Sequence, residues 1–379
     1  MFDLPYPMET QSLPTSNRLI SIDAMRGFDM IMICGVDAFF HDLHGKTGLP
    51  WVDALAKQFE HPVWIGLTFY DFIFPVFLFI AGVSIPFSLT RALDRGVSKN
   101  EIYKKAFVRM LILIGLGMLD KNIPFPYFDW PHIRLGSVLG RIGLACFVTV
   151  VLYLNLSSAK RLYVIGGTLL LYYVCVMFIP VPGYGAGNLT FEGNLIGWID
   201  RTFLPGRLLQ GTYDELGILT QFPAICLTLL GAYAGEILKE HSMTERKKLT
   251  RLLIAGIICL ALGLIWSVHF PIAKRLWSSS FILVTGGMAF VTLAAFYWVI
   301  DMLHFKKWSF VFVVIGMNSL TIYMIYRFIN FKYTARMLFE GLYNSLDEKW
   351  WSVFESLGAL ILVWFFLYFL YRKKIFFSV

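Results

Sequence analysis

A histidine and an aspartate ten residues apart are the side chains in this sequence best suited to acid–base chemistry. His61 precedes a long apolar run, and Asp71 lies just inside it. A carboxylate can orient one imidazole nitrogen and leave the other free as a general base. A loop histidine is also commonly a solvated or capping residue, so spacing alone leaves both interpretations open. The other six histidines are scattered without metal-ligand spacing, and we expect no metal.

Charged residues inside apolar runs form a second group of candidates, because ionisable groups are costly in a membrane and are often functional. Asp23 and Arg26 lie three residues apart in the first run, where they can form an intrahelical pair that positions the helix. Asp37 lies near the other end of this run without a local cation. That position favours a role in a site or a cavity.

Two arginines and a later polar cluster complete the candidates. Arg134 and Arg141 flank the start of another apolar run, where an arginine can simply extend to lipid headgroups. Arg141 lies deeper, beside glycines that allow close helix approach, and an anionic ligand or a buried aspartate could be its partner. Asn318, Ser319 and Tyr323 lie together in a later run, where hydrogen bonding between helices is the alternative to ligand binding.

The elements that must position these residues are membrane helices. Of the 379 residues, 57% are hydrophobic and only 15% are charged, a composition that predicts an all-α, polytopic membrane bundle. Runs of about 17–25 apolar residues are long enough to span a bilayer. We predict ten spans, near 18–40, 67–90, 104–120, 136–155, 161–180, 216–238, 252–268, 279–302, 309–330 and 352–371.

The distribution of basic residues predicts the orientation of these spans. With a cytoplasmic N-terminus, most Lys and Arg residues fall in the cytoplasmic connections, whereas the opposite 41–66 loop carries only Lys46 and Lys57. Both termini are then cytoplasmic, with a tail at 1–17, a membrane domain at 18–371 and a basic tail at 372–379. The net charge of +8 lies in these short clusters, so we expect lipid and not nucleic acid as the partner.

Several ordered motifs match one family along nearly the whole chain from Arg18. They include Arg18-Leu19-Ile20-Ser21-Ile22-Asp23-Ala24-Met25-Arg26-Gly27, His61 to Trp64, Gly66-Leu67-Thr68, Asp71, Phe74-Pro75, Arg134 to Gly143, Leu276-Trp277-Ser278 and Gly316-Met317-Asn318-Ser319. Together they resemble the transmembrane acetyltransferases typified by heparan-α-glucosaminide N-acetyltransferase. The chain is similar to the short bacterial form, without the lumenal N-terminal domain of the animal members.

This resemblance implies transfer of an acetyl group from cytoplasmic acetyl-CoA to an amino sugar on the opposite face of the membrane. The family's catalytic histidine and its partner aspartate fall on His61 and Asp71. Contacts to acetyl-CoA or the acceptor are expected from Asp37, Arg26, Arg134, Arg141, Trp277, Ser278, Asn318 and Ser319. Asp37 stands where the animal members have Asn. A bacterial inner membrane and a homodimer are further expectations.

The expected mechanism is general-base catalysis, in which His61 deprotonates the acceptor amine and Asp71 orients the imidazole. Asn318, or a backbone amide within 61–68, would hold the acetyl oxygen. In a rival mechanism His61 itself accepts the acetyl group. Two other functions also stay open: a non-catalytic transporter of a glycan or acyl carrier, and an O-acetyltransferase acting on another cell-envelope polysaccharide.

Overall fold

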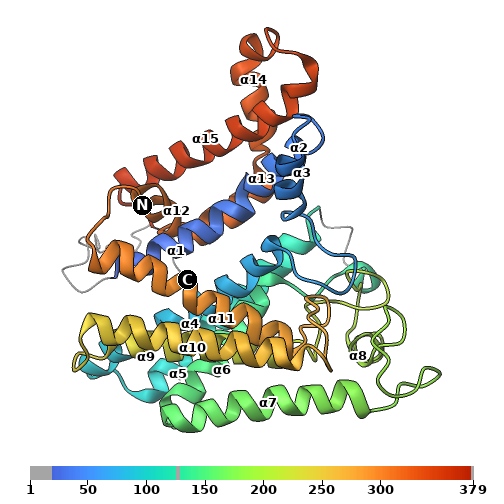
Figure 1. The fold of residues 1–379 in the computed structure, drawn as a ribbon, viewed down its shortest axis with the longest axis vertical. Coiled ribbons are helices and arrows are strands. Elements are labelled where there is room, and N and C mark those ends of the chain that lie inside the picture. The colour runs from blue at the N-terminus through green and yellow to red at the C-terminus, as the bar shows by residue number, and fades with distance from the viewer. Residues whose placement is uncertain (1–18, 125–128, 377–379) are drawn as a thin grey trace, which may run out of the picture.

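The structure, a computed structural model, describes residues 19–124 and 129–376 apart from the side chain of Trp130 (Figure 1). These residues fold into helices, and within them the only β-type pairings are isolated bridges, Gly66 with Ala273 and Val181 with Gly185. The all-α prediction is therefore confirmed. The predicted tail 1–17, and residues 377–379 of the predicted basic tail, lie outside the described residues.

The helices differ widely in length, and two of the long ones end in a short π-helical segment. In chain order they are α1 (Ile20–Ile31), η1 (Met32–Val36), α2 (Asp37–Leu43), α3 (Pro50–Lys57), α4 (Phe69–Asp94), α5 (Lys99–Asn122), η2 (Trp130–His132), α6 (Val138–Asn155), α7 (Ser158–Phe178), α8 (Leu195–Phe203), α9 (Gln221–Lys239), α10 (Glu245–Trp266), α11 (Ser279–Phe296), η3 (Tyr297–Met302), α12 (Phe310–Gly316), α13 (Ser319–Phe328), α14 (Phe331–Tyr343), η4 (Glu348–Trp350) and α15 (Trp351–Arg372).

Each of the ten predicted spans coincides with one helix or with a broken pair of helices. Seven described helices are long and apolar enough to cross a membrane, and the pair α12–α13, bent by 71°, would make an eighth. The first predicted span is interrupted at η1, and α5 begins with several charged residues, so neither meets that criterion. A multi-pass membrane protein is supported, whereas the count of ten and the cytoplasmic termini stay predictions.

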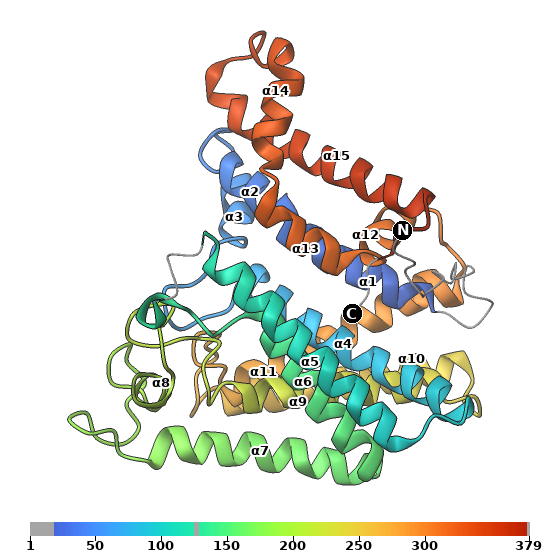
Figure 2. The same cartoon turned by 180° about the vertical axis from the view of Figure 1, so that it is seen from behind.

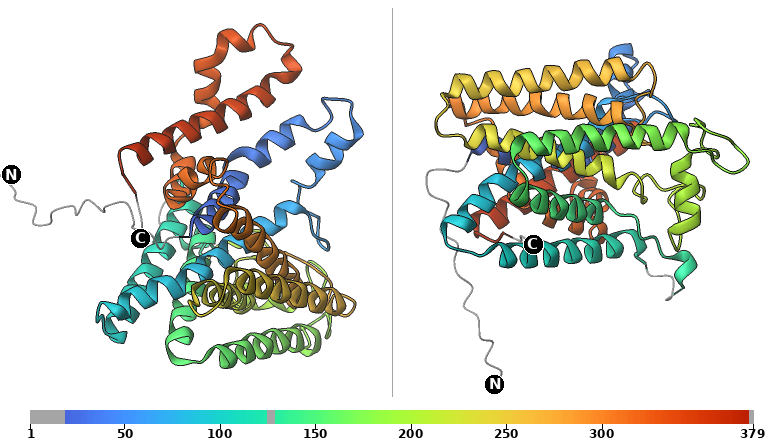
Figure 3. Two further views of the ribbon diagram at one scale, coloured as in Figure 1. Left: turned by 60° about the vertical axis from the view of Figure 1, so that its left-hand side comes forward. Right: turned by 90° about the horizontal axis from the view of Figure 1, so that it is seen from below.

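The larger apolar core lies among α4, α6, α7, α9, α10 and α11, which occupy the lower half of Figure 1; Figure 3 shows the same bundle from two further sides. Helices α4 and α9 touch through their backbones. A Cβ atom at Gly82 would lie 2.0 Å from the Thr228 carbonyl oxygen, and one at Gly231 would lie 2.0 Å from that of Phe79. Glycine is required at such crossings because membrane helices gain their association energy from close packing.

A second apolar core joins α1, α12, α13 and α15 (Figure 2). Here Gly27 of α1 lies against the Phe312 carbonyl group, where an added Cβ would be only 1.7 Å from the oxygen. The first helix then breaks, because Gly35 has φ 137° and Cys34 also leaves helical geometry. Asp37, the first residue of α2, follows this break directly.

The loops that hold the candidate site gather at the end of the bundle marked by α3 and α8, on the right of Figure 1. The segment before α4 and the 271–278 segment before α11 run side by side there, since the Gly66 N–H donates to the Ile272 carbonyl oxygen at 2.9 Å. Two loops that are far apart in the sequence thus lie side by side. Their contacts bring residues distant in sequence into one site.

Candidate active site

The first turn of α4 fixes the predicted histidine–aspartate pair. Thr68 is the N-cap residue, and its backbone N–H donates to Asp71 Oδ2 at 3.1 Å, which is one half of a capping box. The other oxygen, Asp71 Oδ1, lies 2.6 Å from His61 Nδ1. The Asp71 side chain is 1% exposed and that of His61 is 34% exposed. The pair therefore has a buried anion and an imidazole open to an incoming ligand.

A lysine that sequence reasoning missed completes this group, which we call the His61 cluster (His61, Asp71 and Lys274). Lys274 Nζ lies 3.3 Å from Asp71 Oδ1 and 3.4 and 3.3 Å from His61 Nδ1 and Nε2. The Lys274 side chain is 13% exposed. Burial lowers the pKa of this lysine below its ordinary value, because desolvation disfavours the ammonium. Lys274 and His61 are 213 residues apart, so no local spacing signals the contact.

Asp37 is connected to the His61 cluster through one tyrosine. The imidazole of His61 stacks on the Tyr70 ring with 5.1 Å between centroids and 29° between planes. The Tyr70 hydroxyl donates to Asp37 Oδ2 at 2.8 Å. Asp37 thus contacts the hydroxyl group of Tyr70, and the His61 imidazole lies on the face of the same ring. The expected role of Asp37 in binding stays a prediction.

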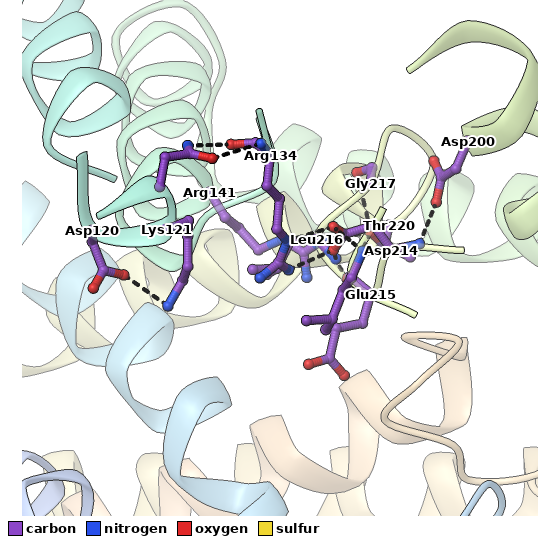
Figure 4. A network of polar contacts seen from close by, with 12 residues as sticks. Asp120, Lys121, Arg134, Arg141, Asp200, Asp214, Glu215, Leu216, Gly217 and Thr220 are labelled. Carbon is purple, nitrogen blue, oxygen red and sulfur yellow. Dashed lines mark hydrogen bonds and ion pairs between the residues drawn. The ribbon is translucent and has the colours of Figure 1, made fainter. Parts of the chain in front are cut away.

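Arg134 lies in a separate, buried group that we call the Arg134 network (Arg134, Asp214, Arg141 and Trp277; Figure 4 shows the first three). Arg134 Nε and Nη2 donate to the two carboxylate oxygens of Asp214 at 2.7 and 2.8 Å. Asp214 also accepts from the backbone N–H groups of Leu209 and Leu216. Because this bidentate pair satisfies both partners, Arg134 is committed to the protein itself.

Arg141 is less completely satisfied. Its Nη2 donates to the Glu215 carbonyl oxygen at 2.7 Å and to the Thr220 hydroxyl, and its guanidinium carbon lies 4.3 Å from the Trp277 ring centroid. The residue is 1% exposed, yet Nε and Nη1 have no hydrogen-bond partner among the described residues. Trp277 is fully buried, and Ser278 accepts from the backbone N–H of Phe281 at the start of α11.

Asp200 holds the loop around the Arg134 network. Its two oxygens accept from the backbone N–H groups of Ile218 and Asp214 at 3.0 and 3.2 Å. Burial raises the pKa of Asp200 to about 6, because the charged form loses solvation. A Cβ on Gly217 would lie 2.2 Å from this carboxylate, so the loop closes only with glycine there.

The remaining predicted residues lie in neither group. Arg26 contacts Asp23 at 3.3 Å and donates to the Ser84 hydroxyl at 2.8 Å. Asn318 and Ser319 lie at the bend between α12 and α13, where the Asn318 amide donates to the Ile375 carbonyl oxygen at 3.1 Å. The structure thus brings His61, Asp71 and Asp37 together, and separately Arg134, Arg141, Trp277 and Ser278.

The geometry of the His61 cluster suits proton transfer. Asp71 occupies Nδ1, which leaves Nε2 as the ring nitrogen available to a substrate proton. Lys274 Nζ is almost equidistant from both ring nitrogens, so its nitrogen is not aligned with either lone pair. It therefore acts on the imidazole mainly through its charge and not through a directed hydrogen bond.

Comparison with known proteins agrees with these observations. Residues 18–271 match the family model described as heparan-alpha-glucosaminide N-acetyltransferase, catalytic. Proteins named heparan-alpha-glucosaminide N-acetyltransferase from Mus musculus and Homo sapiens are each 28% identical, over 433 and 419 aligned residues. The alignments cover 99% and 96% of this chain but 62% and 60% of the relatives, so the chain spans about three fifths of their length. Because the family model matches well over half of the chain, this membrane protein belongs to the heparan-α-glucosaminide N-acetyltransferase catalytic family.

Proposed function

We propose that this protein is a membrane acetyltransferase that moves the acetyl group of acetyl-CoA to the amine of an amino sugar. Membership of the family supports acetyl transfer, and the names of the relatives supply the glucosamine-type acceptor. The observation that carries the proposal is the contact of 2.6 Å between a buried Asp71 and a half-exposed His61. This pair provides a base at the end of the bundle where the loops gather.

The reaction needs an amine without its extra proton. His61 Nε2 takes one proton from the acceptor ammonium, and the neutral nitrogen attacks the thioester carbonyl carbon. A C–N bond forms and the C–S bond breaks. The protonated His61 returns its proton to the departing thiolate, and the second nitrogen proton passes to solvent. A base of this kind contributes about 10²–10⁴-fold to the rate.

Lys274 has a positioning role in this scheme. The imidazole must take up a proton at Nε2 while Nδ1 stays on Asp71. The ammonium of Lys274, 3.3 Å from both Asp71 Oδ1 and His61 Nε2, lies against both members of this pair. It helps to hold Asp71 in place beside the imidazole.

The Arg134 network supports the site in two ways. Arg134 and Asp214 hold the loop that follows α8 against the start of α6. Among the described residues, two buried guanidinium nitrogens of Arg141 have no hydrogen-bond partner, so we propose Arg141 as a contact for the acetyl donor, with Trp277 and Ser278 fixing its surroundings. For Arg26, Asn318 and Ser319 the proposed contacts lie along α1 and at the start of α13, outside both the His61 cluster and the Arg134 network.

The two substrates reach the site from opposite faces in this proposal. The basic residues favour a cytoplasmic position for the ends of the bundle away from His61. Acetyl-CoA carries phosphates, so its nucleotide would lie at that basic end and its acyl arm would extend between the helices. The inner membrane of a bacterium meets this requirement, because its cytoplasmic face has access to acetyl-CoA.

Direct transfer fits the His61 cluster better than an acetylated histidine. An acetyl group on Nε2 would remove the base, and the incoming amine would then need another one. Among the described residues, only Asp71 and Lys274 contact the His61 ring nitrogens, and both are engaged with each other. Radiolabelled acetyl-CoA alone should therefore leave no label on the protein, whereas label that is retained and absent from His61→Ala would establish the covalent route.

The test of the proposed function is CoA release from acetyl-CoA by the full-length protein in lipid nanodiscs. Glucosamine should stimulate release, whereas glucose and N-acetylglucosamine should not, because they lack a free amine. A polysaccharide hydroxyl that stimulates release without any amine would indicate an O-acetyltransferase. No release with any acceptor would contradict acetyl transfer and would favour a transporter.

A further inference from the structure

A cavity of about 420 Å³ opens between the break in the first helix and the turn from α13 to α14. Its walls come from η1, α2, α13 and the first residues of α14. Sites for small molecules commonly measure about 300–1,000 Å³, so a monosaccharide-sized ligand fits this range. Asp37 lines this cavity.

The cavity exists because two helices change direction at the same place. Gly35 has φ 137°, a conformation that side chains rarely adopt, and a Cβ there would lie 3.1 Å from Leu360 and 3.2 Å from the Tyr326 hydroxyl. On the other wall, α13 ends at Phe328 and α14 begins at Phe331. These backbone features are built into both walls, so the opening does not depend on one side-chain rotamer.

Three charged side chains line the cavity, and only one lacks an ionic partner. Arg327 Nε lies 3.0 Å from Asp120 Oδ1, and Lys332 Nζ lies 2.7 Å from Asp42 Oδ2. Asp37 forms no ion pair among the described residues, and its side-chain partner there is the Tyr70 hydroxyl. Asp120 is shared between Arg327 and Lys121, whose Nζ lies 2.7 Å from Asp120 Oδ2, so the charges around the cavity do not sum to a net negative charge. The feature that suits an amine is the Asp37 carboxylate itself, the one acidic side chain of the lining, with polar groups beside it for hydroxyls.

The cavity also lies beside the His61 cluster. The Tyr70 hydroxyl donates to Asp37 Oδ2 at 2.8 Å, and the face of the same ring stacks on His61. A cationic group held by Asp37 would thus lie next to the ring that carries the imidazole. This juxtaposition connects an unpaired carboxylate, a cavity and a candidate base.

We propose that this cavity is the acceptor site and that Asp37 binds the amino sugar as its ammonium form. This inference rests on the proposed function. It adds the site at which the acceptor binds and a reason why the product is released. The ammonium is attracted to Asp37, but acetylation converts it to a neutral amide. The product therefore loses the charge that held the acceptor and leaves the cavity.

Direct binding tests this site without any catalysis. Glucosamine, glucose and N-acetylglucosamine are titrated into full-length protein in nanodiscs in the absence of acetyl-CoA, with calorimetry as the readout. The wild type should bind glucosamine and neither neutral sugar. Asp37→Asn should weaken glucosamine binding by about 10- to 100-fold, as expected for loss of a charge-assisted contact. Asp347→Asn, at an exposed carboxylate in the η4 turn, should leave binding unchanged.

A second variant protects the test against a misfolded Asp37→Asn protein. Ala38→Phe fills the cavity without removing a charge and should also abolish glucosamine binding while the protein stays monodisperse. Equal binding of glucosamine by the wild type and both variants would overturn the proposal. Asp37-dependent binding without CoA release would support the site and sink the acetyl transfer, whereas CoA release with an unchanged KM in Asp37→Asn would sink the site alone.

Discussion

The His61 cluster and the Arg134 network are both ionic, but they differ in how far the protein satisfies its own polar groups. Asp214 receives a bidentate arginine and two backbone N–H groups and is completely buried. The His61 side chain, in contrast, is partly exposed, and among the described residues its Nε2 is contacted only by the Lys274 ammonium. A group whose hydrogen-bonding atoms are all paired within the protein stabilises the structure, whereas a basic nitrogen that is still accessible can take part in a reaction.

The two groups are joined by the 271–278 segment. Lys274 contacts the His61 cluster, Arg275 pairs with Glu215 at 3.3 Å, and Trp277 lies under Arg141. One short segment therefore sets the position of a charge beside the imidazole and of an aromatic ring in the buried network. Variants in the His61 cluster should change the rate of the reaction, whereas variants in the Arg134 network should change the stability of the fold.

The largest effect is expected from Asp71→Asn. The amide oxygen can still accept from Thr68 at the start of α4, but it no longer holds His61 as a carboxylate does. Turnover should fall by about 10²–10⁴-fold, because the imidazole loses its orienting anion and its preferred tautomer. Steady-state CoA release gives kcat, and thermal unfolding checks the fold. A wild-type kcat would remove Asp71 from the mechanism.

Arg134→Ala should act on stability instead. It leaves Asp214 buried without its cation, which costs about 3–5 kcal/mol. The expected result is a lower unfolding temperature and a lower folded yield in detergent, with nearly normal activity per folded molecule. Arg207→Ala, at an exposed arginine of the same loops, is the matched control. A normal unfolding temperature with lost activity would instead show that Arg134 serves the reaction.

Lys274→Met should change the pH dependence of kcat/KM. Lys274 Nζ lies 3.3 Å from both Asp71 Oδ1 and His61 Nε2, so its removal takes a positive charge away from the base. Because a nearby positive charge opposes the uptake of a proton, the acidic limb of the profile should move to higher pH in the variant. Lys274→Arg should restore the wild-type limb, and Lys57→Met, at an exposed lysine of α3, should not move it. An unmoved limb in Lys274→Met would exclude the electrostatic role.

The wild-type enzyme should also show the titration of Lys274 itself. Burial lowers the pKa of this lysine, so its charge is lost at a lower pH than that of a surface lysine. As the pH rises through that value, Asp71 loses the ammonium that lies 3.3 Å from its Oδ1 and helps to hold it beside His61. A change in the alkaline part of the profile should therefore be present in the wild type and absent from Lys274→Met.

The smallest effect is expected from Tyr70→Phe. The ring still stacks on His61, but Asp37 loses its hydrogen bond. The KM for the acceptor should change by about 2- to 10-fold with little change in kcat, since only the orientation of Asp37 is affected. A collapse of kcat would instead place the hydroxyl in the proton transfer.

The sequence predicted the helical class and the positions of the long helices because apolar runs leave a clear periodic and compositional signal. It also predicted His61 with Asp71, whose short spacing lets one helix start bring them together. It did not predict Lys274, because that contact depends on how two distant loops pair through Gly66 and Ala273. Nor could it tell that Arg134 is neutralised by Asp214, 80 residues away, or that the first helix breaks at Gly35.

The chain contains a matched pair for testing the central claim, that His61 is the base. His132 contacts Asp129 through Nδ1 at 2.7 Å, much as His61 contacts Asp71, but both side chains are more than half exposed. CoA release with glucosamine should be compared for His61→Ala and His132→Ala at equal amounts of folded protein. We expect a loss of about 10²–10⁴-fold for His61→Ala and wild-type turnover for His132→Ala. Unchanged turnover in His61→Ala would contradict the assignment of His61 as the base.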